Sequence, residues 1–512
     1  MSRLNHKLIS YILGLLLLFN GLAMLVTSGV SLLVNDGIFN DISSSGIITI
    51  SFGIILMMLN RNNVRQINKR DGYLIVTLGW ITMILSGMLP YYLTGSLSTF
   101  SNMLFESMSG YTATGSTVIS DIESLPKSII FWRSMTHWLG GMGIIVLAIA
   151  ILPLLGIGGM QLFSAEAPGS GISGDKMHPR ISSTAKRLWF IYVGLTFAET
   201  LALNVAGMSF FDAINHSMSN IATGGFSTKN NSLAYWNDIP LIQYIVIFFM
   251  ILAGTNYLLI YSALLGKFKK LFTNTEFIWY LTVISIFVIL TSFVLFVNVD
   301  LSTSNVNHPE IYGRLESSFR HAFFQIVAII TTTGFVSGDF AGWTPFLTML
   351  FFALMFIGAS SGSTSGGIKI SRHLILIKNG FLEFKKALHP NAVLPLRYNH
   401  SVVKKEVIVN ILAFFMLYLI LFVIGAGVLS TQGLDFISAV GGSAASIGNV
   451  GPAIGSLGPT LSYEGLSGFA KVWCSFLMLV GRLELFTLLI IFSPYFWKKI
   501  KIKHFLFASQ LQ

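Results

Sequence analysis

Four short segments that contain glycine recur along the chain, each between two long apolar stretches. They read YTATGST around Gly115, NIATGGFST around Gly224, IITTTGFVS around Gly334 and AASIGNVGP around Gly448, so the glycines are 109, 110 and 114 residues apart. Main-chain carbonyl oxygens that point at one axis can replace the water around a bare cation. Such a geometry needs positive φ values, which glycine adopts at little cost. The segments therefore predict a cation pathway lined by backbone oxygens.

The predicted filter takes three residues from each segment. A threonine precedes three of the glycines and would add a stiff β-branched side chain and a hydroxyl, whereas Ile447 stands there in the fourth segment, which is the least similar. No ring of carboxylates or arginines occurs at these positions, which favours a monovalent cation over Ca²⁺ or anions. One such segment would be an ordinary turn; four at one period favour a K⁺ filter. Its predicted residues are Ala113, Thr114, Gly115, Ala222, Thr223, Gly224, Thr332, Thr333, Gly334, Ser446, Ile447 and Gly448.

The composition is that of an integral membrane protein. Of 512 residues, 53% are hydrophobic and 10% are charged, and the mean hydropathy is +0.73, whereas a soluble domain carries about a quarter charged residues. The first apolar segment is too long for a signal peptide and is interpreted as a membrane anchor. At roughly 20 apolar residues per spanning helix, ten spans are expected. Their ranges are 8–30, 46–60, 73–93, 128–152, 188–207, 240–265, 277–299, 342–378, 406–429 and 470–494.

The charges favour a topology with both termini in the cytoplasm. With the N-terminus inside, 25 of the 32 Lys and Arg residues fall in loops on one side of the membrane, as the positive-inside rule requires. The net charge of +11 is therefore interpreted as a topology signal and not as a nucleic-acid surface. Loops on the other side are acidic, which serves either solvation or local enrichment of cations. Cys474 is the only cysteine, so an intrachain disulfide is excluded.

The repeat predicts an all-α membrane protein with four helix–pore-loop–helix units around a pseudo-fourfold pore, plus two extra N-terminal transmembrane helices. The eleven residues that end at each glycine are too few to span the bilayer and suit a re-entrant half-helix followed by extended backbone. Each half-helix would aim its carbonyl end at the pore centre. The predicted units are 1–71 (N-terminal extension), 72–160, 161–270, 271–380 (with a broken second helix) and 381–512 (with a basic tail).

The segment 342–378 is expected to be broken in its middle and to supply a gate. As one straight helix it would be about 55 Å long at ~1.5 Å per residue, which exceeds a hydrocarbon core of ~30 Å, and its centre holds poor helix formers. Broken membrane helices mark substrate sites; close helix packing through small residues is the alternative. The candidate gate residues are Gly358, Ala359, Ser360, Ser361, Gly362, Ser363, Thr364, Ser365, Gly366, Gly367 and Arg482.

Three of the ionisable residues inside the expected spans are candidates for a functional role. Arg482 is central in the last span, and an ionised residue in a membrane is a functional hypothesis by default. A guanidinium near the pathway would raise a barrier to cations and would hold the gate loop through its carbonyl oxygens. The alternative is an ion pair with Glu484 or Glu199. Glu199 and His137 are interpreted as helix-to-helix hydrogen-bonding groups, with proton coupling as the weaker hypothesis.

Several motifs resemble the Trk/Ktr/HKT superfamily of potassium transporters, and most closely the Trk-type potassium uptake pore subunits. Besides the four filter segments, these are AGTN (253–256), IGASSGSTSGG (357–367), IGNVGP (447–452) and GRLE (481–484). The resemblance covers roughly residues 5–495. It implies that the 357–367 segment crosses the pore below the filter and that the position of Arg482 faces the pore. Relatives that carry sodium tend to have serine at the first filter glycine, so Gly115 favours potassium.

The resemblance also implies partners and a location. It implies a gated potassium uptake subunit in the bacterial plasma (inner) membrane, a homodimer with separate pores, and a cytoplasmic nucleotide-binding regulatory subunit of the RCK type (TrkA-like). The loops 153–187 and 379–405 are expected to dock that subunit and to attract anionic lipid heads. This chain has no Walker motif and no GxGxxG opening a βαβ unit, so no cofactor besides the transported K⁺ is expected here.

Other functions fit the residues less well. A sodium-permeable or cation-coupled member of the same superfamily is the main alternative. The pore subunit of the potassium-pumping ATPase would have extra loops, and a carrier with inverted repeats would show two halves instead of four units. An enzyme is not expected, because the sequence holds no HExxH, no GxSxG and no acid pair at membrane depth.

Overall fold

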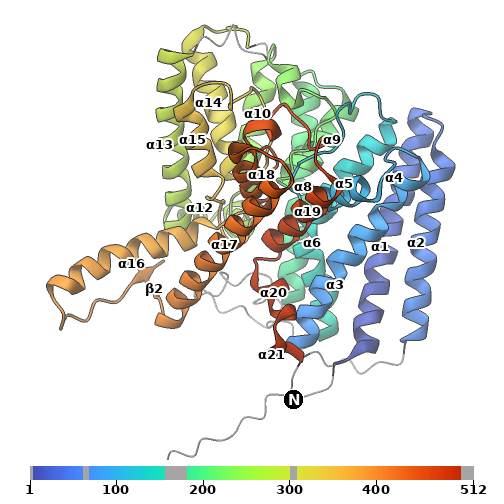
Figure 1. Ribbon diagram of the computed structural model, residues 1–512, viewed down its shortest axis with the longest axis horizontal. Helices are drawn as coiled ribbons and strands as arrows, with labels where there is room; N and C mark the ends of the chain where they lie inside the picture. The colour runs from blue at the N-terminus through green and yellow to red at the C-terminus, as the bar shows by residue number, and fades with distance from the viewer. Residues whose placement is uncertain (1–3, 62–67, 156–180, 300–307, 400, 498–512) are drawn as a thin grey trace, which may run out of the picture.

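The computed structural model describes residues 4–61, 68–155, 181–299, 308–399 and 401–497, and the regular secondary structure of this part is almost entirely helical (Figure 1). The N-terminal extension consists of α1 (His6–Val34) and α2 (Phe39–Leu59). The first repeat contains α3 (Lys69–Gly87), α4 (Leu89–Leu93), α5 (Phe100–Tyr111) and α6 (Lys127–Leu155). The second contains α8 (Ile181–Val205), α9 (Phe210–Ile221), the short 3₁₀ helix η2 (Ser232–Trp236), α10 (Pro240–Ala253), α11 (Tyr257–Leu264) and α12 (Phe268–Phe272).

The third and fourth repeats follow the same order. The third contains α13 (Thr275–Asn298), α14 (Arg314–Ile330), α15 (Pro345–Leu354) and α16 (Ile370–Leu388). A two-residue antiparallel ribbon, β1 (Arg397–Tyr398) with β2 (Ser401–Val402), leads to the fourth. The fourth contains α17 (Lys405–Thr431), α18 (Phe436–Gly448), η4 (Gly455–Leu457), α19 (Gly468–Arg482), α20 (Phe486–Phe492) and α21 (Pro494–Trp497). The predicted all-α class is confirmed.

Long apolar helices surround a set of short ones. Six described helices are long and apolar enough to cross a membrane, and eight if two bent helix pairs each count as one crossing. The other two expected spans correspond to α6 and to α15 with α16. The unit boundaries stay predictions: those after residues 71, 270 and 380 fall inside α3, α12 and α16, and the one after 160 lies outside the described residues.

Three second helices of the repeats are broken at one level of the fold. The predicted break in 342–378 is confirmed, because α15 ends at Leu354 and α16 begins at Ile370. The expected spans 240–265 and 470–494 are also broken, which was not predicted: α10 and α11 meet at 105°, and α19 and α20 at 115°. In the first pair Asn256 caps α11 by accepting from the Leu258 amide. In the second, Glu484 and Leu485 both have positive φ.

Glycines bring the two helices of the N-terminal extension into backbone contact. A Cβ added at Gly14 would lie 2.6 Å from the Gly53 carbonyl oxygen, and one at Gly21 would lie 2.8 Å from that of Gly46. Only glycine permits this approach, which is the small-residue packing common between membrane helices. The pair forms one slab at the edge of the molecule in Figure 1.

Polar contacts hold this slab on the first repeat at three levels. At one end, Asp36 accepts from the Ser128 amide at 2.9 Å; at the other, the Asn5 amide donates to Asp71 at 3.0 Å. Between them, buried Asn20 donates to Ser86 Oγ at 2.8 Å and accepts from the Tyr111 hydroxyl at 2.6 Å. Tyr111 is the last residue of α5, so α1 braces the segment that enters the first filter loop.

Asn20→Leu is expected to destabilise the protein by about 1–3 kcal/mol, because the buried Tyr111 hydroxyl would lose its acceptor. Thermal unfolding of the detergent-solubilised protein measures the effect. Leu22→Ala is the control on the same helix, since Leu22 is 47% exposed and its truncation should lower the midpoint less. An unchanged midpoint for Asn20→Leu would contradict the bracing role.

Candidate functional site

The four short helices α5, α9, α14 and α18 begin and end in similar ways. Three begin with a side-chain cap: Thr99 accepts from Asn102, Ser209 from Asp212 and Asp435 from Ser438. At each end, one amide donates to the carbonyl five residues earlier at 2.8–3.0 Å. The four bonds run from Thr114 to Ser109, Gly224 to Ser219, Thr333 to Ala328 and Val450 to Ala445.

Each of these amides lies between two residues with positive φ. The preceding residues are left-handed, with φ of 51–56°: Ala113, Thr223, Thr332 and Asn449. The following residues are glycines, with φ of 72–96°: Gly115, Gly225, Gly334 and Gly451. This turn ends each half-helix and exposes the next carbonyl groups, and its repetition defines which residues of the four repeats correspond.

The four turns meet in a closed ring. A Cβ added at Gly115 would lie 2.1 Å from the carbonyl oxygen of Gly224, and one at Gly225 would lie 2.0 Å from that of Thr333. A Cβ added at Gly334 would lie 2.1 Å from the carbonyl oxygen of Val450. One added at Gly451 would lie 2.5 Å from the carbonyl oxygen of Thr114, which closes the ring. Each ring glycine thus packs on the neighbouring repeat, and the half-helices direct their negative carbonyl ends at one column.

The structural correspondence differs from the sequence-based one in two repeats. Ala113–Gly115 and Thr332–Gly334 occupy the ring as expected. In the second repeat the ring glycine is Gly225, and Ala222 only caps α9, so the expected triplet is one residue early.

In the fourth repeat, Ser446, Ile447 and Gly448 form the last turn of α18. The turn follows three residues later at Asn449, Val450 and Gly451, because asparagine tolerates the left-handed conformation without a glycine.

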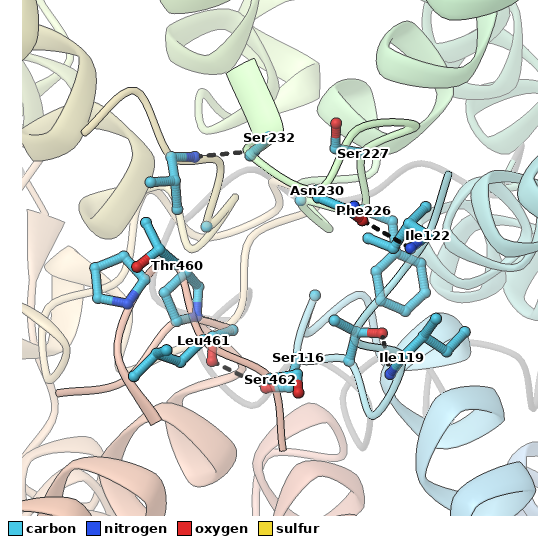
Figure 2. A pocket seen from close by; sticks show the side chains of 18 of the residues that line it. Ser116, Ile119, Ile122, Phe226, Ser227, Asn230, Ser232, Thr460, Leu461 and Ser462 are labelled. Atoms are coloured by element: carbon cyan, nitrogen blue, oxygen red, sulfur yellow. Dashed lines mark hydrogen bonds between the residues drawn. The ribbon is translucent and has the colours of Figure 1, made fainter. Parts of the chain in front are cut away.

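A polar vestibule of about 290 Å³ opens on one side of the ring. All four ring glycines line it, so the column is shared by the four repeats. Figure 2 shows its wall: Ser116, Ile119 and Ile122 from the first repeat, Phe226, Ser227, Asn230 and Ser232 from the second, and Thr460, Leu461 and Ser462 from the fourth. Hydroxyl and amide groups line much of this surface, beside apolar side chains and the basic residues Arg133 and Lys229.

The loop between α15 and α16 lies against the opposite side of the ring. Thr364 Oγ1 donates to the carbonyl of Ile221, the last residue of α9, at 3.0 Å. The Gly366 amide donates to Thr332 Oγ1 at 2.6 Å, and a Cβ at Gly366 would lie 2.9 Å from the Gly448 carbonyl oxygen. The loop therefore contacts the second, third and fourth repeats directly beneath the ring.

Other members of the predicted gate anchor the loop to its surroundings. The Ser360 amide donates to Gly254, the Gly362 carbonyl accepts from Tyr257, and the Ser361 amide donates to Glu276 at 2.6 Å. The Gly358 amide and the Ala359 carbonyl bond to Ile368 and Ile370, and Ser363 donates to Ser360. Ser365 accepts from Lys369, and Gly367 is left-handed with φ of 65°. The structure thus describes a loop that is held in place.

Arg482 joins this loop to the first repeat. Its Nη1 donates to the Thr364 carbonyl at 2.8 Å and its Nη2 to the Gly140 carbonyl at 3.2 Å. The side chain is 6% exposed. The two carboxylates considered as ion-pair partners are engaged elsewhere: Glu484 pairs with Arg372, and Glu199 accepts from Asn220 at 2.6 Å.

His137 and Glu199 make contacts between helices. His137 Nδ1 lies 2.8 Å from Ser219 Oγ, which joins α6 to α9, and its ring stacks on Phe226 with centroids 4.0 Å apart. Glu199 joins α8 to α9 through Asn220. These contacts agree with the helix-to-helix interpretation of both residues.

The expected docking loops are only partly described. Of 153–187, residues 156–180 lie outside the described part. Of 379–405, the structure describes the end of α16 and the β1–β2 ribbon. That end of α16 carries Lys385 and Lys386 in its last turn and projects from the body of the molecule in Figure 1.

Comparison with known proteins identifies the family. A family model named TrkH and described as a cation transport protein matches residues 39–499. The Trk system potassium uptake proteins TrkH of Salmonella typhimurium and Escherichia coli are each 38% identical over 499 residues, which cover 97% of this chain and 100% of the relative. The crystal structure of the potassium transporter TrkH from Vibrio parahaemolyticus matches with a TM-score of 0.84 at 35% identity, covering 96% of this chain and 99% of that one.

These matches confirm the resemblance found in the filter segments and in the AGTN, IGNVGP and GRLE motifs. They extend over nearly the whole chain, and the family model includes every residue of the ring and of the loop beneath it. The chain belongs to the TrkH family of cation transport proteins.

Proposed function

We propose that this chain is the membrane subunit of a potassium uptake system and that K⁺ crosses through the ring of four backbone turns. The closed chain of contacts from Gly115 through Gly225, Gly334 and Gly451 back to the first repeat carries the proposal. It places four equivalent carbonyl groups around one column, where oxygens can replace the hydration shell of a cation.

The proposed ion-coordinating groups are main-chain oxygens. The innermost belong to Thr114, Gly224, Thr333 and Val450, and those of the left-handed residues before them form a second layer. Lacking a net charge, this lining suits a weakly hydrated monovalent ion. Glycine stands at all four ring positions, which favours potassium over sodium by resemblance to the superfamily.

The loop that contains Gly358–Gly367 is proposed as the gate. It packs against the ring on the side opposite the vestibule, and its contacts with Thr332 and Ile221 would have to break for an ion to pass. Arg482 would hold it in place and would oppose cation passage by charge.

Location, assembly and regulation follow from the family and the charge pattern. We infer a multi-pass protein of the bacterial plasma membrane with both termini in the cytoplasm, paired as a homodimer with one pore per chain. Regulation would come from a separate cytoplasmic nucleotide-binding subunit of the RCK type, and no enzymatic activity is proposed. The relatives' names refer to a Trk system, which fits a subunit of a larger assembly.

Uptake of ⁸⁶Rb⁺ by cells that lack their own potassium transporters tests this function. Expression of the chain together with a regulatory subunit should restore uptake, and excess K⁺ should compete more effectively than Na⁺. Uptake that Na⁺ suppresses as strongly as K⁺ would favour the sodium-permeable alternative. No uptake with the protein present in the membrane would contradict the proposal.

A further inference from the structure

One position on the half-helices lies nine residues before each ring glycine and faces the segment that leaves the ring. Glu106, His216, Gln325 and Gly442 occupy it in the four repeats. Glu106 accepts from Thr117 Oγ1 and from the Val118 amide, both at 3.0 Å. His216 Nε2 lies 2.9 Å from Ser227 Oγ. Gln325 Nε2 donates to Ser337 Oγ at 3.2 Å. In three repeats this side chain thus fixes the vestibule end of the filter to its own half-helix.

The first repeat differs because the side chain at this position, Glu106, is a carboxylate. Glu106 is fully buried, and Arg133 from α6 lies beside it, with Nε 2.8 Å from Oε1 and 1% of its side chain exposed. A buried charge is tolerated only with a partner and further hydrogen bonds. The remaining groups of the Arg133 guanidinium therefore decide what the pair does.

The two terminal nitrogens of the Arg133 guanidinium reach two neighbouring filter segments. Arg133 Nη2 donates to Thr117 Oγ1 of the first repeat at 3.2 Å, and Nη1 donates to the Ser227 carbonyl of the second at 3.3 Å. The guanidinium carbon lies 4.1 Å from the centroid of Phe226, which directly follows ring glycine Gly225. Phe226 and Ser227 form the second-repeat wall of the vestibule in Figure 2. One side chain thus spans the boundary between two repeats at the filter mouth.

The second repeat has a neutral group at the corresponding place on its own helix. Gln243 lies 110 residues after Arg133, the same interval that separates Gly115 from Gly225. It accepts from Arg320 Nη1 at 2.6 Å. Of the first two repeats, only the first therefore has a guanidinium at this position, and this guanidinium bridges two filter segments.

We propose that Arg133, held by Glu106, is a positioning residue that sets the spacing between the first and second filter segments and thereby contributes to selectivity for K⁺ over Na⁺. The inference rests on the proposed potassium uptake. A selective filter needs its carbonyl groups at a fixed number and distance around the ion. Loosening one of the four boundaries allows the oxygens to close on a smaller ion. Total uptake then persists while discrimination falls.

Four variants test the positioning role in proteoliposomes. Arg133→Lys keeps the charge but loses the fork that reaches both segments. The double variant Glu106→Gln with Arg133→Gln removes both buried charges together and leaves none unpaired. Thr117→Val removes only the hydroxyl that Glu106 and Arg133 both contact. This variant still tests the inference if the charge variants fail to fold. Lys229→Gln is the matched control, because Lys229 lines the same vestibule but its side chain pairs with Glu123 and lies over the ring of Tyr235.

The measured quantity is the ratio of Rb⁺ to Na⁺ permeability, with total Rb⁺ flux recorded beside it. We expect the ratio to fall about fivefold or more in Arg133→Lys and in the double variant, and about twofold in Thr117→Val, with Lys229→Gln unchanged. An unchanged ratio in the folded Arg133 variants would overturn the inference, as would an equal fall in Lys229→Gln. Failure of the unmodified chain to carry Rb⁺ would instead overturn the proposed function.

Discussion

Gly451→Ala is expected to abolish potassium uptake, whereas Gly448→Ala is expected to preserve most of it. Gly451 has a φ of 96°, and an added Cβ would lie 2.5 Å from the Thr114 carbonyl oxygen, where only backbone could give way. The left-handed conformation alone costs alanine roughly 1–2 kcal/mol, and the clash displaces a group that faces the ion. Gly448 ends α18 with ordinary helical geometry, and its nearest contact would be 3.0 Å. Uptake of ⁸⁶Rb⁺, normalised to the protein in the membrane, measures both effects.

Variants at two further glycines distinguish the steric clash of an added Cβ from the backbone strain of a positive φ. Gly115→Ala should be as harmful as Gly451→Ala, because its Cβ would meet the Gly224 oxygen at 2.1 Å. Gly95 also has positive φ, at 67°, but no atom lies within 4 Å of an added Cβ. Gly95→Ala should therefore cost some stability and leave uptake intact. Loss of uptake in Gly448→Ala together with normal uptake in Gly451→Ala would restore the alignment first suggested by the sequence.

Removal of the Arg482 charge is expected to raise potassium flux. The guanidinium donates to the Thr364 carbonyl of the gate loop and to Gly140, so it both anchors the loop and places a positive charge beside the pathway. At a separation on the order of 8 Å and an effective dielectric constant of about 20, that charge costs a passing cation roughly 2 kcal/mol. Because each factor of ten in rate corresponds to about 1.4 kcal/mol, Arg482→Ala should increase flux roughly thirtyfold in purified, gated protein.

Conservative variants at Arg482 divide the two effects. Arg482→Lys keeps the charge but cannot reach two carbonyl groups in the same way, so it should loosen the loop without removing the barrier. Arg482→Gln removes the barrier and keeps one donor. A rank order in which flux rises from wild type through the lysine variant to the glutamine variant agrees with the account. Unchanged flux in both the alanine and the glutamine variants would contradict it.

The architecture could be predicted from the sequence because it depends on local sequence features that recur in each repeat. Apolar segments of spanning length, basic loops on one side and four glycine-bearing turns at one interval predict the helices and the convergent loops. The run of poor helix formers from Gly358 to Gly367 predicts its own break. The triplets at Gly115 and Gly334 lie in the ring because each of those segments has a single glycine, whereas the second repeat has two in succession and the ring uses the second, Gly225.

The remaining parts depend on contacts that join distant residues. Asn449 makes the left-handed turn of the fourth repeat, and its amide donates to Thr114 at 2.9 Å, an interaction with another repeat. The bend at Glu484 and Leu485 lies in RLEL (482–485), which consists of good helix formers. At this bend, Arg372 of α16 forms an ion pair with Glu484. In AGTN, Gly254 is a typical helix C-cap and Asn256 a typical helix N-cap. These two signals together predict the break between α10 and α11.

The buried pair of Glu106 and Arg133 had the weakest local signal. Glu106 lies within the first pore loop and Arg133 near the start of the next expected span, 27 residues later. Only the fold shows that the two meet at 2.8 Å and reach a second repeat. Comparison of the repeats then distinguishes the pair, because His216, Gln325 and Gly442 stand at the position of Glu106, and Gln243 stands at the position of Arg133 in the second repeat.

The most direct test of the central claim is an experimental structure with Rb⁺ or Tl⁺ in place of K⁺, in which anomalous scattering locates the ions. The account predicts a peak on the column enclosed by the carbonyl oxygens of Thr114, Gly224, Thr333 and Val450, and loss of that peak in Gly451→Ala. Ions bound only elsewhere, with the ring empty at saturating concentration, would show that these four turns do not form the transport site.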